Sequence, residues 1–155
     1  MKKLAVVILS LCAVMLSGCS KKEITVDPTE LANSLLEQVK FVDSMTKLDK
    51  EAVAKLYGIK GELLESQAVY ISTGATAEEI AILKATDEKN ADTLYQALET
   101  RIEDQKTAFE DYVPAEMKKL EDPILIKKGN YVICCISNDN ESANDVITRE
   151  IEKKN

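Results

Sequence analysis

The chain of 155 residues contains no histidine and no tryptophan. Without an imidazole base it cannot form the usual serine or cysteine catalytic triad, and it lacks the nitrogen ligand of most zinc sites. Its five glycines are scattered, and they match neither a phosphate-binding loop nor a dinucleotide-binding pattern. We therefore predict no metal site, no cofactor and no catalytic residue, and we expect that the protein is not an enzyme.

The most hydrophobic segment lies at the N-terminus, where residues 4–16 follow Lys2 and Lys3. A transmembrane helix needs about 20 apolar residues, and this segment is shorter. Basic, apolar and then small residues follow one another in the order of a secretory signal peptide. We expect residues 1–18 to be removed from the mature protein as a lipoprotein signal peptide.

The four residues that end this segment resemble the lipobox of bacterial lipoproteins: Leu16, Ser17, Gly18 and Cys19. In a lipobox, the signal peptidase recognises the three residues before the cysteine, and the cysteine thiol carries diacylglycerol. We predict these roles for Leu16, Ser17 and Gly18 and for Cys19. Two acyl chains hold a protein stably on a membrane, so the predicted location is the extracytoplasmic face of the cell membrane. The alternative is an ordinary secretory signal with a chance cysteine.

The predicted mature protein is acidic and of ordinary domain size. Removing residues 1–18 leaves 18 basic residues against 27 acidic ones, a net charge of about −9. This charge argues against a nucleic-acid partner. We assign residues 19–26 to the lipidated cysteine and a tether, of which residues 20–26 reach about 25 Å at ~3.5 Å per residue. We therefore expect an envelope protein or a wall polymer, close to the membrane, as the partner.

Two cysteines, Cys134 and Cys135, remain in the predicted domain, because Cys12 leaves with the signal and Cys19 is lipidated. Adjacent side chains of an extended strand point to opposite faces of the sheet. A disulfide between them would need the two Cα atoms to be closer than the usual minimum of about 4.4 Å. We expect them to be small buried hydrophobic residues, with a strained redox pair as the alternative.

Hydrophobic periodicity predicts one α+β domain over residues 27–155. Two strand pairs, each joined by a turn, predict an antiparallel sheet of about four strands, with helices packed mainly on one face. Residues 41–48 are ambiguous and include a candidate short strand. The expected helices are 28–40, 50–57, 88–112 (with a break near Gln105 as an alternative), 115–122 and 142–153, and the expected strands are 65–73, 79–86, 124–126 and 131–137.

Two pairs of acidic residues are candidates for carboxylate chemistry. Glu78 and Glu79 precede or begin a predicted strand, and Asp139 and Glu141 follow the strand expected at the centre of the sheet. Glycoside cleavage needs only an acid and a base or nucleophile about 5 to 10 Å apart. The simpler interpretation, which we favour for both pairs, is a solvated loop or a charged edge that discourages strand pairing.

Tyr70 and Tyr131, in predicted strands, could line a groove for a sugar or peptide. Tyrosine also suits strands on packing grounds alone, so we expect both side chains in the core. The apolar stripe of the helix at 88–112 could likewise receive a partner helix. Such a stripe usually faces the sheet of its own domain, and we expect that here.

Three segments, at residues 56–59, 77–82 and 129–132, resemble a family of small bacterial lipoproteins that carry a domain of unknown function. The similarity extends over most of residues 27–155. It occurs at a helix stop, a strand start and a hairpin turn, which are structural features. The resemblance implies no catalytic residue and assigns no binding site.

Three functions remain open from the sequence. We favour a non-catalytic binding or accessory module at the cell envelope, because the predicted tether is short and the usual catalytic side chains are missing. The first alternative is a carboxylate-based hydrolase of wall glycan or peptide. The second is a receptor for a small ligand.

Overall fold

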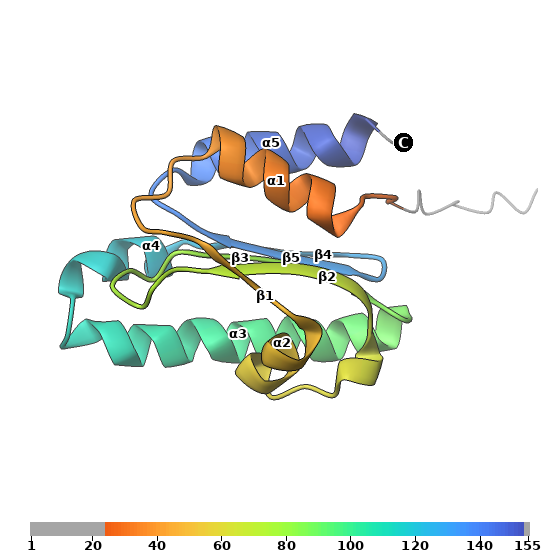
Figure 1. Ribbon diagram of the computed structural model, residues 1–155, viewed down its shortest axis with the longest axis horizontal. Helices are drawn as coiled ribbons and strands as arrows, with labels where there is room; N and C mark the ends of the chain where they lie inside the picture. The colour runs from red at the N-terminus through yellow and green to blue at the C-terminus, as the bar shows by residue number, and fades with distance from the viewer. Residues whose placement is uncertain (1–23, 154–155) are drawn as a thin grey trace, which may run out of the picture.

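Five antiparallel strands form the sheet at the centre of the computed structural model, which describes residues 24–153 (Figure 1). The order of the strands is β1-β2-β3-β5-β4, so that two hairpins, β2–β3 and β4–β5, join through the β3–β5 pair. The strands are β1 (Thr46–Leu48), β2 (Leu64–Ile71), β3 (Glu79–Ala85), β4 (Ile124–Lys128) and β5 (Tyr131–Ile136).

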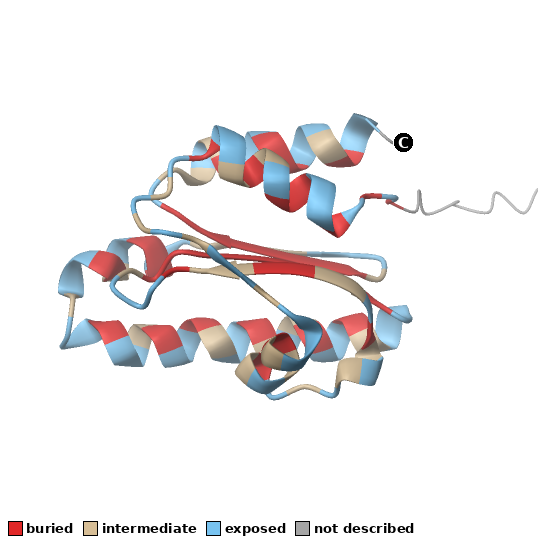
Figure 2. Ribbon diagram, in the orientation of Figure 1, coloured by how far each residue is buried: buried red, intermediate tan, exposed pale blue. Residues whose placement is uncertain are grey.

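Helices cover both faces of this sheet. Figure 1 shows α1 and α5 on one face and α2 and α3 on the other. In Figure 2 the buried residues follow the sheet and the helix sides turned toward it, which corresponds to two hydrophobic cores. The helices are α1 (Pro28–Gln38), α2 (Lys50–Tyr57), α3 (Glu88–Glu110), α4 (Met117–Glu121) and α5 (Asn140–Lys153), with short 3-10 segments η1 (Gly61–Leu63) and η2 (Pro114–Glu116).

Local signals in the sequence determine where the helices start and stop. The carboxylate of Asp27 accepts hydrogen bonds from the backbone N–H groups of Thr29 and Glu30 at the start of α1. Asp49 and Asp87 cap α2 and α3 in a similar way. Gly58 ends α2 with a φ of 63°, a left-handed conformation that glycine adopts without strain. The predicted helix starts are confirmed for these three helices.

The strand β5 is buried along its whole length, as expected for a central strand. Cys134 packs in the core beneath α2 and α3, whereas Cys135 packs in the core beneath α1 and α5. Both thiols are free and buried, so the predicted role as small hydrophobic residues on opposite faces is confirmed. Burial raises the pKa of Cys134 well above its usual value and that of Cys135 to about 12, so both stay protonated and unreactive near neutral pH.

The α+β class, the antiparallel sheet and both hairpins agree with the prediction, and two details differ. The ambiguous segment supplies a fifth strand, β1, paired with β2. Helices cover both faces instead of mainly one, because β3 and β5 carry apolar side chains on both sides and each side must be shielded from water. The predicted long helix is confirmed by α3, which continues without the alternative break at Gln105, whose side chain is buried.

The N-terminal part of the described chain is already packed against the domain. Ile24 and Val26 are 6% and 5% exposed and belong to the core beneath α1 and α5. The packed region therefore begins three residues before the predicted boundary at residue 27. Leu16, Ser17, Gly18 and Cys19 lie outside the described residues. Within residues 24–153, none of the helices combines the length and the hydrophobicity that crossing a membrane requires.

Candidate functional site

Glu78 and Glu79 are each only 1% exposed, at the end of the sheet where β3 begins. The expectation of a solvated loop or a charged edge is therefore wrong for this pair. A buried carboxylate is strongly destabilising unless charges and hydrogen bonds compensate for its lost hydration. Each of the two glutamates has such compensation, from a separate set of partners.

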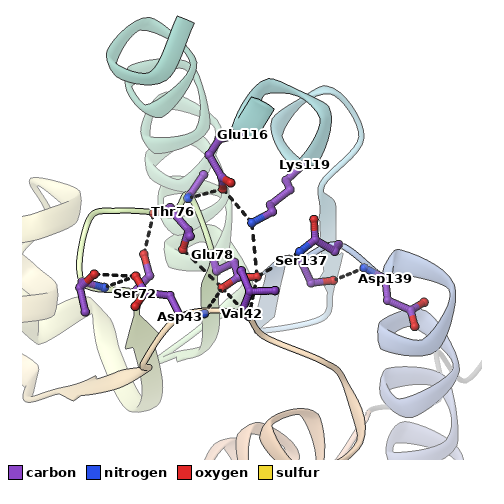
Figure 3. A network of polar contacts seen from close by, with 12 residues as sticks. Val42, Asp43, Ser72, Thr76, Glu78, Glu116, Lys119, Ser137 and Asp139 are labelled. Carbon is purple, nitrogen blue, oxygen red and sulfur yellow. Dashed lines mark hydrogen bonds and ion pairs between the residues drawn. The ribbon is translucent and has the colours of Figure 1, made fainter. Parts of the chain in front are cut away.

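The carboxylate of Glu78 binds the connection between α1 and β1. It accepts hydrogen bonds from the backbone N–H of Val42, at 3.1 Å to Oε1 and 3.0 Å to Oε2, and from the N–H of Asp43 at 3.0 Å. Weaker contacts come from Thr76 Oγ1 at 3.3 Å and Asn138 Nδ2 at 3.4 Å. Figure 3 shows these segments converging on the carboxylate, which thereby joins parts of the chain that are far apart in sequence.

Lys119 connects Glu78 to a third buried carboxylate. Its Nζ lies 3.3 Å from Glu78 Oε1 and 2.8 Å from Glu116 Oε2 (Figure 3). Glu116 Oε2 also accepts a hydrogen bond of 2.8 Å from the backbone N–H of Ala77. Lys119 is 5% exposed and Glu116 is 8% exposed. The three ionised side chains carry a net charge of −1, and the backbone N–H donors at 42, 43 and 77 help to stabilise it.

The loop between β2 and β3 is further held by short polar contacts. Asp43 accepts hydrogen bonds from Thr73, at 2.6 Å from the hydroxyl and 3.0 Å from the backbone N–H. The hydrogen bond from the Thr73 side chain lowers the pKa of Asp43 below its usual value. Ser72 Oγ donates to the carbonyl oxygen of Thr76 at 2.6 Å across the loop. These contacts connect the β2–β3 loop to the segment before β1.

Glu79 is bound by a different set of partners, the side chains of α2 and α3. Tyr57 donates its hydroxyl to Oε1 at 2.8 Å, and Gln105 Nε2 donates to Oε2 at 2.8 Å. Arg101 contacts Oε2 through Nε at 3.1 Å and Nη2 at 3.0 Å. Burial and the neighbouring Glu79 charge raise the pKa of Tyr57 well above its usual value, so the hydroxyl remains a hydrogen-bond donor near neutral pH.

The structure does not bring Glu78 and Glu79 together as an acid and base pair. Their partners come from different elements, and the two oxygens of each carboxylate are occupied by donors. Glu79 begins β3 and binds side chains of α2 and α3, whereas Glu78 precedes the strand and binds the α1–β1 connection and α4.

Asp139 and Glu141, the second candidate pair, also have different environments. Asp139 caps α5, since its carboxylate accepts from the Ser142 N–H at 3.0 Å and from Ser142 Oγ at 2.8 Å. The hydrogen bond from the Ser142 N–H lowers the pKa of Asp139. Glu141 is exposed in the first turn of α5. The solvated interpretation is confirmed for Glu141, while Asp139 has a structural role as a helix cap.

The two tyrosines proposed for a groove pack within the domain. Tyr131 is 3% exposed in the core beneath α1 and α5, which confirms the core assignment. Tyr70 is half-buried beside the same core. The apolar stripe of α3 faces its own sheet through residues such as Leu94 and Leu98, which are fully buried. The predicted core position is thus confirmed for Tyr131 and only partly for Tyr70.

A cleft of about 330 Å³ lies between the β2–β3 loop and the second half of α3. Two exposed large hydrophobic side chains occur in residues 24–153, Tyr112 at 76% and Val42 at 59% exposure. Tyr112 lines the cleft, and Val42 lies in the loop bound by Glu78. Other residues of the cleft wall include Ser72, Thr76, Glu78, Arg101, Gln105 and Phe109.

Among the described residues, no three carboxylate or thiol side chains lie close enough together to hold a metal ion. The buried carboxylates instead have lysine, arginine and N–H donors as partners. These contacts hold the loops and helices around the cleft in place, and so define the surface there. Proton transfer between paired carboxylates is not supported by the positions of Glu78 and Glu79.

Comparison with known protein families matches residues 38–137 to the family described as "Domain of unknown function (DUF4358)". The chain belongs to this family. The predicted resemblance to a family with a domain of unknown function is confirmed, whereas the lipoprotein assignment stays a prediction. No curated protein and no solved structure matches the chain.

The DUF4358 match contains almost the entire site. Both buried glutamates, their charged partners and the cleft lie within residues 38–137, and Asn138 is the one contact of Glu78 beyond that range. Most of α1 and all of α5 lie outside it, although both helices pack on the sheet. The family match thus covers the sheet and the face that α2 and α3 cover. It also covers the end of the sheet at which Glu78 lies, called the Glu78 end below.

The sequence contained a pattern that could have identified the partners of Glu79. Arg101 and Gln105 are spaced by four residues on the helical stripe that also contains Leu94 and Leu98. Polar side chains on such a stripe indicate buried hydrogen bonds, and their partner is Glu79. Glu116 and Lys119 gave no comparable signal, because they occur in a short charged segment in which an exposed position is the normal expectation.

Proposed function

We propose that this protein is a lipid-anchored envelope protein whose domain binds a partner at the Glu78 end and catalyses no reaction. The proposal rests on one observation: the buried charged side chains hold segments of the chain together and are not left free to react. Glu78, Lys119 and Glu116 join the α1–β1 connection, the β2–β3 loop and α4 around a cleft. Rigid loops beside a cleft and an exposed aromatic side chain are features of binding surfaces.

The position of the N-terminus supports an orientation for this surface. The described chain starts at one end of the molecule, and α1 runs from there toward the Glu78 end (Figure 1). The 11 residues of α1 span about 16 Å at 1.5 Å per residue. If Cys19 carries lipid, four residues separate it from the packed Ile24, and four residues span at most about 14 Å at ~3.5 Å per residue. The cleft then faces away from the membrane, toward the wall side.

The hydrolase alternative has less support. Glu78 lines the cleft, but its oxygens accept hydrogen bonds from Val42, Asp43 and Lys119. A general acid or nucleophile needs an oxygen that can reach the substrate. Both oxygens of Glu79 accept from Tyr57, Arg101 and Gln105, so Glu79 does not supply the second carboxylate.

Site-specific photo-crosslinking in intact cells tests the proposal. A photoreactive amino acid is placed at Tyr112, at Val42, or at Lys128, the last residue of β4, at the opposite end of the sheet. We expect one repeated adduct from Tyr112 and Val42, little from Lys128, and loss of the adduct in Cys19→Ala. An equal adduct from Lys128 would contradict the assignment of the binding surface. The absence of any repeated adduct would contradict the accessory function itself.

A further inference from the structure

The α3 wall of the cleft offers an unused hydrogen-bond donor. Arg101 directs Nε and Nη2 to Glu79, while its Nη1 has no hydrogen-bond partner within residues 24–153. The side chain is 26% exposed and lines the cleft. A guanidinium group carries five N–H donors, so several remain for a ligand after Glu79 has been bound.

The same wall offers an unused acceptor one helical turn further along. Gln105 is 3% exposed, and its Nε2 donates to Glu79. Because a carboxylate only accepts hydrogen bonds, this contact fixes which end of the amide is the nitrogen. The remaining oxygen, Oε1, is one of two buried side-chain polar atoms in the described chain that have no partner. A buried acceptor without a donor is destabilising, and a ligand N–H would relieve this.

Charge compensation makes an uncharged ligand the better match. The charge of Arg101 is balanced by Glu79 at 3.0 Å. The oxygens of Glu78 are occupied by Lys119, which it shares with Glu116, and by the backbone N–H groups of Val42 and Asp43. Neither wall of the cleft therefore has an unpaired charge that would select an ion. Beyond Gln105 the α3 wall continues with Ala108 and Phe109, and Tyr112 follows just after the helix; these side chains suit an apolar substituent.

We propose that the cleft binds an uncharged amide group with a small apolar substituent. The amide N–H donates to Gln105 Oε1, and the amide carbonyl accepts from Arg101 Nη1. A volume of about 330 Å³ is at the lower end of the range for small-molecule sites. Because Gln105 Oε1 has less than 1 Å² exposed, binding requires a small displacement of the side chains around it.

Two sources share this chemistry, an N-acetylated sugar and a short peptide. The inference rests on the proposed binding function and specifies what the cleft recognises. It differs from that proposal in its test, because binding of a small probe to the purified protein requires neither a membrane nor a protein partner. The crosslinking test in cells and the probe-binding test can therefore give opposite results, and failure of one can be told from failure of the other.

Binding of matched probes to the full-length chain in mild detergent, followed by NMR, tests the inference. The peptide arm compares N-acetylalanine N-methylamide with the diester in which oxygen replaces both amide N–H groups. The sugar arm compares N-acetylglucosamine with glucose. We expect at least one amide probe to bind ten-fold or more tightly than its matched control, and the arm that does so identifies the source. Equal binding within both pairs, or no binding of any probe, would overturn the inference.

Two variants locate the site. Gln105→Met removes the acceptor and should abolish the preference for the amide probe. Tyr57→Phe removes another hydrogen bond to the same Glu79 but leaves the cleft wall unchanged, and should retain the preference. If Gln105→Met does not fold, Tyr112→Ala at the exposed rim serves as the second variant, with an expected loss of affinity of three-fold or more. Unchanged affinity and preference in the folded cleft variants would contradict this position.

Discussion

Glu78 and Glu79 are neighbours in sequence and equally buried, yet they perform different structural tasks. Glu78 accepts mainly from backbone N–H groups and a lysine, and so fixes loops at the end of the sheet. Glu79 accepts only from side chains, and so holds α2 and α3 against the sheet. The comparison teaches that strand alternation can direct two identical residues to two separate networks, one that shapes a surface and one that stabilises packing.

The largest expected effect is the removal of the cation from the Glu78 network. Lys119→Met leaves Glu78 and Glu116 buried without a positive partner, and we expect a loss of about 3–5 kcal/mol of unfolding free energy. Chemical denaturation measures this loss. The matched control is Lys118→Met, since Lys118 is exposed on the same short helix. Similar losses in both variants would show that the buried ion pairs contribute little.

The second prediction compares the loss of stability when each of the two glutamates is replaced by glutamine. Glu78→Gln places an NH₂ group against backbone N–H donors that cannot turn around, and we expect a loss of about 2–3 kcal/mol. Glu79→Gln faces the Tyr57 hydroxyl, which can rotate and accept a hydrogen bond, and a loss of about 1–2 kcal/mol is expected. Denaturant midpoints of both variants check the order, and the reverse order would refute the distinction between backbone and side-chain donors.

A smaller effect should follow from the removal of one donor to Glu79. Tyr57→Phe deletes a buried hydrogen bond of 2.8 Å to a carboxylate, and we expect a loss of about 1.5 kcal/mol. Tyr112→Phe deletes an exposed hydroxyl on the same face and should change stability by less than about 0.5 kcal/mol. Thermal unfolding of the two variants distinguishes them, and equal shifts would argue against the Tyr57 contact.

The smallest effect concerns pH at the Glu78 end. The hydrogen bond from Thr73 lowers the pKa of Asp43 in the folded protein. A carboxyl with a lowered folded pKa contributes stability above the unfolded pKa, near 3.9, and this contribution disappears as the pH falls through the folded value. We expect Asp43→Asn to reduce the loss of stability between about pH 5 and pH 2. Melting temperatures across this range provide the measurement, and an identical pH profile in both proteins would contradict it.

Much of the fold could be predicted because its signals are local. Asp27, Asp49 and Asp87 each cap a helix through N–H groups two or three residues away, and Gly58 ends α2 by its own conformation. The strand at residues 131–136 has apolar side chains on both faces, which indicated a central position. The same observation required helices on both faces of the sheet, a consequence that the predicted one-sided packing missed.

The site was less accessible to sequence reasoning, because its contacts join distant residues. Glu78 and Glu79 were identified as candidates, but charge alone favoured exposed positions. The donors to Glu78 at Val42 and Lys119 are 36 and 41 positions away. No periodicity or short motif in the chain links those positions, and the cleft exists only where the β2–β3 loop meets α3.

The sequence by itself determined the α+β class, the starts of α1, α2 and α3, the two hairpins and the opposite orientation of Cys134 and Cys135, since each depends on local hydrogen bonds or on strand alternation. Only the tertiary structure decided that Glu78 and Glu79 are buried and that Arg101 and Gln105 face a cleft. The physical reason is that a buried charge is tolerated only where donors from several segments converge on it. Such convergence is a property of the packed chain.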